Sequence, residues 1–436
     1  MPSNEQNAQH FLLGAVAGQA EFILDELKSH SDCLRAEIAG SYRRGNETLQ
    51  NLDFLVATSH PEAVLDFFTQ LPEVTTIITR EPSHASVVLD TGVPCELKTV
   101  SNAAFPFALI DLTGNQEHNI ALRRIARQQG YRLTEQQLTP IDPPNTPATR
   151  EIHDEADLYA ALGLDCPPAE LRENQGELQA AAEHQLPRLI EIGNLRGTFH
   201  NHTTASDGQN TLIEMTNAAI ELGLQYLGIA DHSKSSTQCN GLDEKQLLNQ
   251  LRDIRNINEN FTDENIDFRL LAGSEVDIHE DGSLDFNDEL LSQLDYSVAS
   301  VHHAFELSES AMTQRIIRAV ENPHVTMLGH LTGRLLLKTA PYPVDIPTII
   351  DACAATNTII ELNCNPWRLD MDWRWWKLAK EKGVKCAINP DAHRAQDFDS
   401  LFFGIKIARK GWLTAQDVIN CLPRDQMLQA LQVKRP

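Results

Sequence analysis

The sequence predicts a multidomain protein of the α/β class, with an α+β half followed by a half of alternating strands and helices. Its 436 residues correspond to about three domains of ordinary size. Short β-rich runs crowd residues 34–100, whereas seven short apolar runs alternate with amphipathic stretches between residues 195 and 388. This second pattern is typical of parallel strands covered by helices, either in a barrel or in a doubly wound sheet.

The composition is that of an ordinary globular protein, with 42% hydrophobic and 22% charged residues. A formal charge of −25 argues against a protein that coats nucleic acid, but bound divalent ions can reverse a local potential, so phosphate substrates are not excluded. The eight cysteines include no CxxC pair, and no basic residue precedes the short apolar stretch near the start. We therefore expect free thiols, no secretory signal, no membrane partner and a cytoplasmic location.

In the N-terminal half, helical periodicity covers residues 10–30 and precedes a small sheet. The predicted strands are RAEIAG, LDFLVAT, TTIIT, ASVVLD and CELKTV, with a helix, PEAVLDFFTQL, between the second and the third. Helical character returns in HNIALRRIARQQG, which we expect to end at Gly130. The proline-rich PIDPPNTPATRE predicts a loop.

In the C-terminal half, each apolar run is followed by polar side chains that can bind a metal ion. The runs are LRGTF, QYLGIA, FRLLAG, YSVASV, VTMLG, TIIEL and VKCAI. In βα barrels the carboxyl ends of the strands carry the active site, because the βα loops converge there. The candidate metal ligands are His200, His202, Asp207, His232, Glu275, His302, His330, Asp391 and His393.

The strength of this prediction lies in the whole set, because with 16 histidines a single His-x-His pair arises by chance. Imidazoles and carboxylates without thiolates suit Zn, Mn or Fe. Nine ligands suit two to three divalent ions, with Glu275 as a bridge. Ions held by Glu275, His202 and Asp391 would activate water and neutralise phosphoryl oxygens, so we expect these residues to be catalytic. Asp231 could orient His232 instead of binding metal.

Six stretches of the C-terminal half together resemble the PHP (polymerase and histidinol phosphatase) domain: HNHTTASDG, ADHS, SEVDI, SVHHAF, GHLTGR and NPDAHR. The resemblance, placed at residues 192–436, implies a distorted (β/α)7 barrel with a trinuclear metal centre. It implies three ligand groups: His200, His202, Glu275 and Asp391; Glu275, His302 and His330; and Asp207, His232 and His393. In GHLTGR, Arg334 is a candidate catalytic phosphate clamp, with a structural salt bridge as the alternative. Arg368 and Lys234 are further candidates of the same kind.

A second candidate site lies in GSYRRG and the strand after it. Gly40 and Ser41 could present a backbone donor and a hydroxyl to phosphates, with Arg43 and Arg44 supplying charge; a surface loop is the alternative. In NLDFLV, the period of a strand puts residues 51 and 53 on one face, as in sites that hold metals for phosphoryl transfer.

Four stretches of the N-terminal half are similar to the bacterial family X DNA polymerases, which join a DNA polymerase beta-like core to a PHP domain. These stretches are GSYRRGNETLQNLDFLVAT, ASVVL, TGNQEHNIALRRIARQQGYRLTEQQL and AELRENQGEL. The resemblance implies five segments: a helical remnant of the fingers region at 1–32, a nucleotidyltransferase palm at 33–104, a thumb at 105–175, a linker at 176–191 and the PHP domain at 192–436. It also implies that the chain begins after most of the family's helix-hairpin-helix region.

Two departures from the family pattern concern the polymerase site. The expected three aspartates appear as Asn51, Asp53 and Glu96, and the expected aromatic pair before the TGN turn appears as Asp111 and Leu112. An amide is a weaker ligand for a hard cation, and a longer side chain misplaces its carboxylate. We therefore expect a degenerate nucleotide-binding site with weak Mg²⁺ binding and no templated polymerisation.

The resulting hypothesis is a metal-dependent phosphoesterase acting on nucleic-acid 3′ ends, as a 3′–5′ exonuclease or end-processing repair enzyme. DNA is the expected partner, and nucleotides are further candidate ligands. One alternative is an active family X DNA polymerase with 3′–5′ exonuclease activity. Another is a small-molecule phosphatase of the histidinol-phosphatase type, or a nucleotide-binding regulator. Primer extension and hydrolysis of small phosphomonoesters distinguish these hypotheses.

Overall fold

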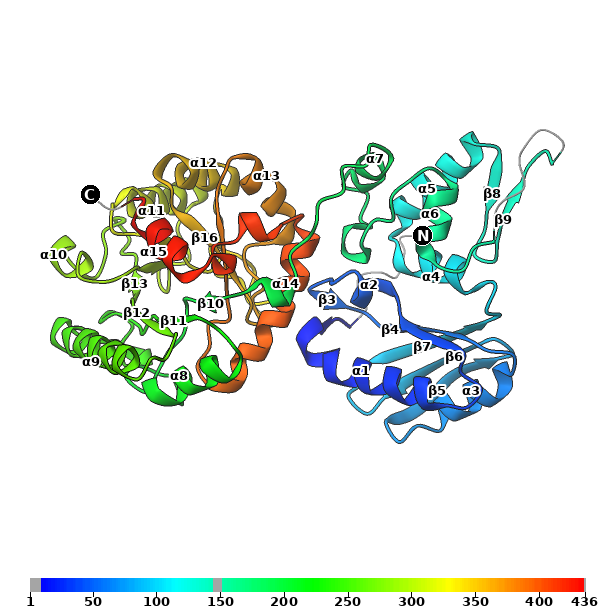
Figure 1. Ribbon diagram of the computed structural model, residues 1–436, viewed down its shortest axis with the longest axis horizontal. Coiled ribbons are helices and arrows are strands. Elements are labelled where there is room, and N and C mark those ends of the chain that lie inside the picture. Colours follow the sequence, from blue (N-terminus) through cyan, green and yellow to red (C-terminus); the bar gives the residue numbers. More distant parts are fainter. Residues whose placement is uncertain (1–8, 144–150, 435–436) are drawn as a thin grey trace. The chain divides into compact units, whose positions relative to one another are not determined.

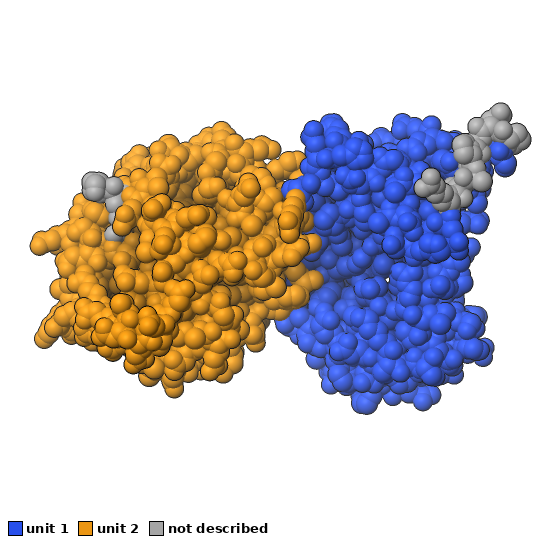
Figure 2. All heavy atoms as spheres, viewed as in Figure 1, with its two compact units in different colours: residues 1–187 blue, residues 188–436 orange. Residues whose placement is uncertain are grey.

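The computed structural model describes residues 9–143 and 151–434, and the chain divides into two compact units, residues 1–187 and 188–436 (Figure 2). The unit boundary lies within the predicted linker 176–191. Residues 144–150 of the predicted proline-rich loop lie outside the described residues. Among the helices that the structure describes, none is long and apolar enough to cross a membrane.

The first unit contains a five-stranded sheet, two short strand pairs and seven α-helices within its described residues (Figure 1). The strands are β1 (Phe11–Leu12), β2 (Arg35–Ile38), β3 (Thr48–Leu49), β4 (Leu52–Ala57), β5 (Val74–Glu81), β6 (His84–Leu89), β7 (Pro94–Val100), β8 (Tyr131–Leu133) and β9 (Leu138–Pro140). The helices are α1 (Leu13–Ser29), α2 (Gly40–Arg43), α3 (Pro61–Thr69), α4 (Phe105–Thr113), α5 (Gln116–Gln128), α6 (Glu155–Ala161) and α7 (Glu177–Ala182).

All five strands predicted for the sheet are confirmed, and they lie in the order β2-β4-β7-β6-β5. Only β4 and β7 are parallel, and their register places Asp53 beside Glu96. Along β7 buried residues alternate with partly exposed ones, so one face packs inward and the other carries polar groups. The predicted helix before Gly130 is confirmed as α5, and Gly130 has a left-handed backbone with φ 86°.

Helices α4 to α7 form a separate core in the first unit. Phe107 and Ile110 of α4 pack with Leu122 of α5, Tyr159 of α6 and Leu178 of α7. Helix α7 therefore belongs to the first unit, although it lies in the segment predicted as a linker. The finer division into five segments stays a prediction.

The second unit alternates parallel strands with helices (Figure 1). The strands are β10 (Gly197–Thr198), β11 (Tyr226–Ile229), β12 (Arg269–Ala272), β13 (Glu275–Asp277), β14 (Val298–Ser300), β15 (Met327–Leu328), β16 (Ile359–Asn363) and β17 (Cys386–Asn389). The helices are α8 (Leu212–Glu221), α9 (Glu244–Asp263), α10 (Asp288–Leu291), α11 (Glu309–Glu321), α12 (Ile346–Thr356), α13 (Trp376–Glu381), α14 (Leu401–Lys410) and α15 (Arg424–Gln432).

These strands close into a barrel. Parallel pairing runs through β10-β11-β12 and through β13-β14-β15-β16-β17, and a parallel bridge between His232 and Glu275 joins the two sheets. A second bridge, between Asn201 and Ala392, joins the first strand to the last. Each of the seven predicted runs contains a strand. Two residues separate β12, the strand of the third run, from the additional strand β13. The closure selects the barrel over the doubly wound sheet.

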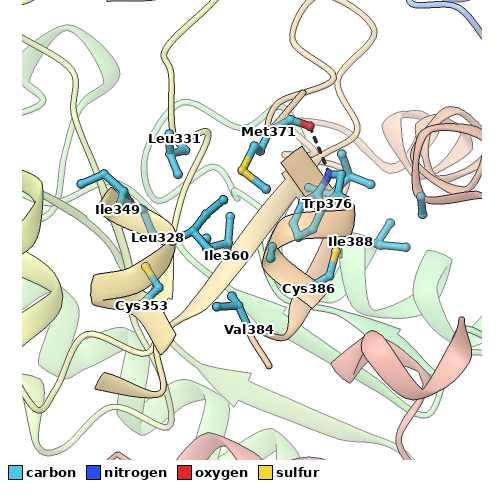
Figure 3. Close-up of a cluster of buried hydrophobic side chains, with 14 of the residues drawn as sticks. Leu328, Leu331, Ile349, Cys353, Ile360, Met371, Trp376, Val384, Cys386 and Ile388 are labelled. Carbon is cyan, nitrogen blue, oxygen red and sulfur yellow. Dashed lines mark hydrogen bonds between the residues drawn. The ribbon is translucent and has the colours of Figure 1, made fainter. Parts of the chain in front are cut away.

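A core of fully buried apolar side chains holds the strands and helices of the barrel together. Leu328 of β15, Ile360 of β16 and Ile388 of β17 belong to one buried cluster with Trp376 of α13, as Figure 3 shows. The Trp376 indole donates a hydrogen bond to the Met371 carbonyl at 3.2 Å. All eight cysteines are free, as predicted, and four of them are buried.

Candidate metal centre

Side chains from the carboxyl ends of the barrel strands meet at one site in the second unit. Parallel strands direct these ends to the same side of the barrel, which brings their loops together. Three groups of possible ligand atoms result, each spanning no more than 4.8 Å: His202, Asp207, His232 and His393; His200, His202 and Asp391; and His232, Glu275 and His302. Nε2 of His330 lies 2.9 Å from Oε1 of Glu275. The structure thus places all nine predicted ligand side chains at one site.

Glu275, in β13, lies in the middle of this site and is only 1% exposed. Its carboxylate faces five imidazole nitrogens: His232 Nδ1 at 2.9 Å, His330 Nε2 at 2.9 Å, His302 Nε2 at 3.2 Å, His200 Nε2 at 3.3 Å and His202 Nε2 at 3.7 Å. Burial by itself raises the pKa of Glu275, but positive charge on the imidazoles outweighs it and lowers the pKa well below its usual value. This environment favours the ionised form of the carboxylate.

The donor atoms of the site fit divalent cations. At this site, five buried imidazole nitrogens make no hydrogen bond of good geometry within the described residues: Nε2 of His200, both ring nitrogens of His202, Nδ1 of His232 and Nδ1 of His330. Buried polar atoms are rarely left without a partner, and a neutral imidazole nitrogen is a preferred ligand for Zn and related ions. The residues present thus offer lone pairs that metal ions would satisfy.

Two carboxylates that the sequence analysis missed orient these histidines. Glu361, buried in β16, accepts a hydrogen bond from Nδ1 of His200 at 2.6 Å and from the backbone N–H of His330 at 2.7 Å. Asp277, in β13, accepts one from Nδ1 of His302. Such partners select the ring tautomer that leaves Nε2 free for a metal ion. The available signal was a charged residue inside an otherwise apolar strand, as in TIIEL.

Asp231 has a different role from the one considered for it. Its carboxylate accepts hydrogen bonds from the Thr203 N–H and hydroxyl, both at 2.7 Å, and from the Gln250 amide. These contacts hold the loop after β10, which carries His200 and His202. The alternative in which Asp231 orients His232 has no support from these hydrogen bonds.

The Glu361→Gln variant is expected to bind Mn²⁺ or Zn²⁺ about 10- to 100-fold more weakly, because an amide cannot hold His200 in the same tautomer with the same strength. Isothermal titration of the metal-stripped protein measures this change. The matched control is Glu381→Gln, which alters an exposed glutamate at the end of α13. Equal affinities for Glu361→Gln and the control would contradict the orienting role.

The arginine and lysine candidates near the site differ in their surroundings. Arg334 donates to the Arg368 carbonyl at 2.9 Å, to Asp372 at 2.9 Å and to the Leu369 carbonyl, so its guanidinium holds the loop after β16. These contacts favour a structural role for Arg334, as in a salt bridge, over a role as a phosphate clamp. Lys234 pairs with Glu244 at 2.6 Å. Arg368 contacts a candidate ligand, with Nε 3.7 Å from Oδ2 of Asp391.

The second candidate site lies at the start of the sheet in the first unit. The Asp53 carboxylate sits against the backbone of Gly40, where a Cβ atom would lie 1.9 Å from Oδ2. The Asn51 amide donates to Oδ1 of Asp53 at 2.7 Å, and Glu96 lies beside Asp53 on β7. Burial and the charge of Glu96 raise the pKa of Asp53 to about 6. The structure thus brings these four residues together, and half-buried Ser41 follows Gly40 in α2.

The two arginines of GSYRRG are engaged in ion pairs within the first unit. Arg43 forms a bidentate pair with Glu155 at 2.6 and 2.9 Å, and Arg44 pairs with Glu173 at 2.8 Å. A carboxylate that already accepts both forks of a guanidinium competes with a phosphate for it. The structure therefore favours a structural role for Arg43 and Arg44, whose acidic partners lie over 100 residues away in the sequence.

Glu155 is the centre of a partly buried ion-pair network, because Arg172 also donates to it. Burial by itself raises the pKa of Glu155, but the charges of Arg172 and Arg43 outweigh it and lower the pKa to about 2. The folded pKa lies below the unfolded value of about 4.3, so this stabilisation is present above pH 4.3 and is lost as the pH falls towards 2.

The Glu155→Gln variant is expected to lose roughly 3 kcal/mol of stability in the first unit at pH 7, because two arginines lose their counter-charge. All five tryptophans lie between residues 367 and 412, so tryptophan fluorescence follows the second unit while circular dichroism follows both. We expect an earlier transition by circular dichroism with unchanged fluorescence. The exposed Glu151→Gln is the matched control, and identical unfolding curves for the two variants would contradict the network.

Comparisons with known proteins cover both units. Residues 108–173 match the family described as DNA polymerase beta thumb, and residues 198–363 match the PHP domain. The chain is 36% identical over 416 residues to a Bacillus subtilis (strain 168) protein named DNA polymerase/3′-5′ exonuclease PolX, which covers 94% of this chain and 71% of that protein. It is 29% identical over 236 residues to a Thermoanaerobacter sp. (strain X514) protein named "Probable phosphatase", covering 51% of this chain and 88% of that protein.

Proposed function

Because the chain belongs to the bacterial family X DNA polymerases, we propose that its PHP barrel is a metal-dependent phosphoesterase that removes nucleotides from DNA 3′ ends. The observation that carries this proposal is the convergence of nine imidazole and carboxylate side chains at the carboxyl ends of the barrel strands. The name of the Bacillus subtilis relative includes a 3′–5′ exonuclease, which supports the same reaction class.

Two or three divalent ions, of Zn, Mn or Fe, would be held by three ligand groups. We assign His200, His202, Glu275 and Asp391 to one ion, Glu275, His302 and His330 to a second, and Asp207, His232 and His393 to a third. Such ions, when bound, supply Lewis acidity at a phosphoryl oxygen and lower the pKa of a water molecule towards neutrality.

The chain's own residues prepare the site for this chemistry. Glu361 and Asp277 hold the Nδ1–H groups of His200 and His302, so that each Nε2 keeps its lone pair. His200, His202 and Glu275 are at most 1% exposed, which limits competing contacts with bulk water. Arg368 adds a positive charge beside Asp391 and is our candidate for contacting a phosphate oxygen.

We propose that the palm-like region is a nucleotide- or DNA-positioning module without polymerase chemistry. Asn51 removes a formal charge from the place where two Mg²⁺ ions would be held. Arg43 and Arg44 are committed to Glu155 and Glu173. Asp111, which stands where the family has an aromatic residue, pairs with Arg123. These features together support weak Mg²⁺ and nucleotide binding at Gly40, Ser41, Asp53 and Glu96.

A second candidate function is hydrolysis of small phosphomonoesters, as in a histidinol-phosphatase-type enzyme. It is favoured by the match to proteins named as phosphatases, which covers about half of the chain. The acidic net charge of −25 is also compatible with a small substrate.

A strand labelled at its 5′ end and incubated with Mn²⁺ tests the two functions together. The proposed exonuclease shortens the strand one nucleotide at a time from the 3′ end and releases nucleoside monophosphates. A phosphatase instead leaves the strand intact but releases phosphate from a 3′-phosphorylated end or from a small phosphomonoester. An intact strand under these conditions would overturn the exonuclease proposal.

A further inference from the structure

A cavity of about 350 Å³ opens beside the metal centre. Its polar lining includes the candidate ligands His302 and His330 together with Arg368. The rest of the lining is mostly apolar and includes Phe305, Leu335, Ala340, Pro341, Tyr342 and Pro343. Sites for small organic ligands have volumes of about 300–1,000 Å³ and pair apolar walls with a few polar groups. This cavity therefore has the size and lining of a site for one small, flat, partly apolar group.

The aromatic wall of the cavity is built rigidly. Tyr342 is 7% exposed and its hydroxyl donates a hydrogen bond to the Leu331 carbonyl. Gly333 has φ 59°, and a Cβ atom there would lie 2.6 Å from the Tyr342 ring, so a side chain at position 333 would push the ring out of place. The Phe305 ring stacks on Tyr342, with 6.0 Å between ring centroids and 10° between ring planes.

Phe305 is 43% exposed even though it lines this cavity. An exposed aromatic ring costs hydration free energy unless something covers it, and a ring held by a second aromatic ring offers a flat, preorganised surface. Nucleobases stack on such surfaces regardless of sequence, because every base has a π face.

The polar groups that line the cavity suit a phosphate. Arg368 lines the cavity, and its Nε lies 3.7 Å from the Asp391 carboxylate of the metal centre. A group bound in the cavity would therefore have a cation and the metal ligands next to it. A nucleotide has the matching chemistry, with a flat base at one end and a phosphate at the other.

We propose that this cavity binds the base of the 3′-terminal nucleotide, which stacks on Phe305, and so places the adjoining phosphodiester at the metal centre. The inference rests on the proposed exonuclease function and adds its substrate subsite. A terminal nucleotide with any base fits, whereas a sugar without a base loses the stacking contact.

Two DNA strands test this subsite in the full-length protein with Mn²⁺: one with an ordinary 3′-terminal nucleotide and one with a 3′-terminal abasic residue. The wild type is expected to remove the ordinary nucleotide about tenfold faster, because the abasic residue lacks the base that stacks on Phe305. In Phe305→Ala this ratio is expected to fall close to one. The control is Phe402→Ala, which removes a phenylalanine of α14 that is 44% exposed, and the wild-type ratio is expected to persist.

A binding measurement separates the subsite from the chemistry. A strand carrying fluorescent 2-aminopurine at its 3′ end is mixed with metal-stripped protein, and stacking is expected to quench the fluorescence in wild type and Phe402→Ala but not in Phe305→Ala. Equal quenching in all three proteins, or an abasic end removed as fast as an ordinary end by the wild type, would overturn the subsite. Quenching without any strand shortening after Mn²⁺ is added would support the subsite and refute the exonuclease.

Discussion

The double variant His202→Ala, Asp391→Ala is expected to lose DNA 3′-end hydrolysis by about a thousandfold. We assign His202 and Asp391 to the same ion, and Nε2 of His202 lies 3.2 Å from Oδ1 of Asp391. Removing both side chains would take an imidazole and a carboxylate away from that proposed ion. Since metal ions supply several kcal/mol of transition-state stabilisation, their loss corresponds to about this factor in rate.

The measurement is release of labelled mononucleotides with Mn²⁺, combined with elemental analysis of the purified protein. The bound metal is expected to fall by at least one ion per chain. The control double variant His184→Ala, Asp399→Ala changes an exposed histidine and an exposed aspartate elsewhere, and it is expected to keep both metal and activity. Unchanged hydrolysis in His202→Ala, Asp391→Ala would show that the PHP barrel does not catalyse the reaction.

Primer extension across a one-nucleotide gap is expected to be about a thousandfold slower than for the Bacillus subtilis relative. Asn51 in place of a carboxylate removes one negative charge from the predicted Mg²⁺ site, and Glu96 places its carboxylate one methylene further from the strand. Displacement of a metal-held phosphate by about one ångström is costly in rate. Arg43 and Arg44 add to the defect, because their ion pairs with Glu155 and Glu173 compete with a triphosphate.

The assay is best made in the His202→Ala, Asp391→Ala background, because the proposed exonuclease would otherwise degrade the extended primer. The assay contains a labelled primer, Mg²⁺ or Mn²⁺ and all four deoxynucleotides. The Bacillus subtilis protein under the same conditions is the positive control. Extension at a rate comparable to that control would show that Asn51, Asp53 and Glu96 form a working polymerase site.

The strands and the set of candidate ligands could be predicted from the sequence because both depend on local patterns. Apolar runs such as QYLGIA and TIIEL alternate with amphipathic stretches, and this alternation predicts parallel strands with covering helices. The carboxyl ends of such strands share one side of the sheet or barrel. Polar residues that follow the strands, such as His200 and Asp391, therefore converge whatever the details of packing.

The partners of individual charged groups could not be predicted, because they depend on which distant segments pack together. Arg43 pairs with Glu155, 112 residues away in the sequence, and Nδ1 of His200 hydrogen-bonds to Glu361, 161 residues away. Arg334 donates hydrogen bonds to the loop after β16, whereas the sequence analysis considered it as a phosphate clamp. The choice between a barrel and an open sheet also depends on distant segments, since the bridge between Asn201 and Ala392 joins the first strand to the last. Periodicity acts over a few residues, whereas ion pairs and barrel closure require atoms to meet within a few ångströms after the whole chain has folded.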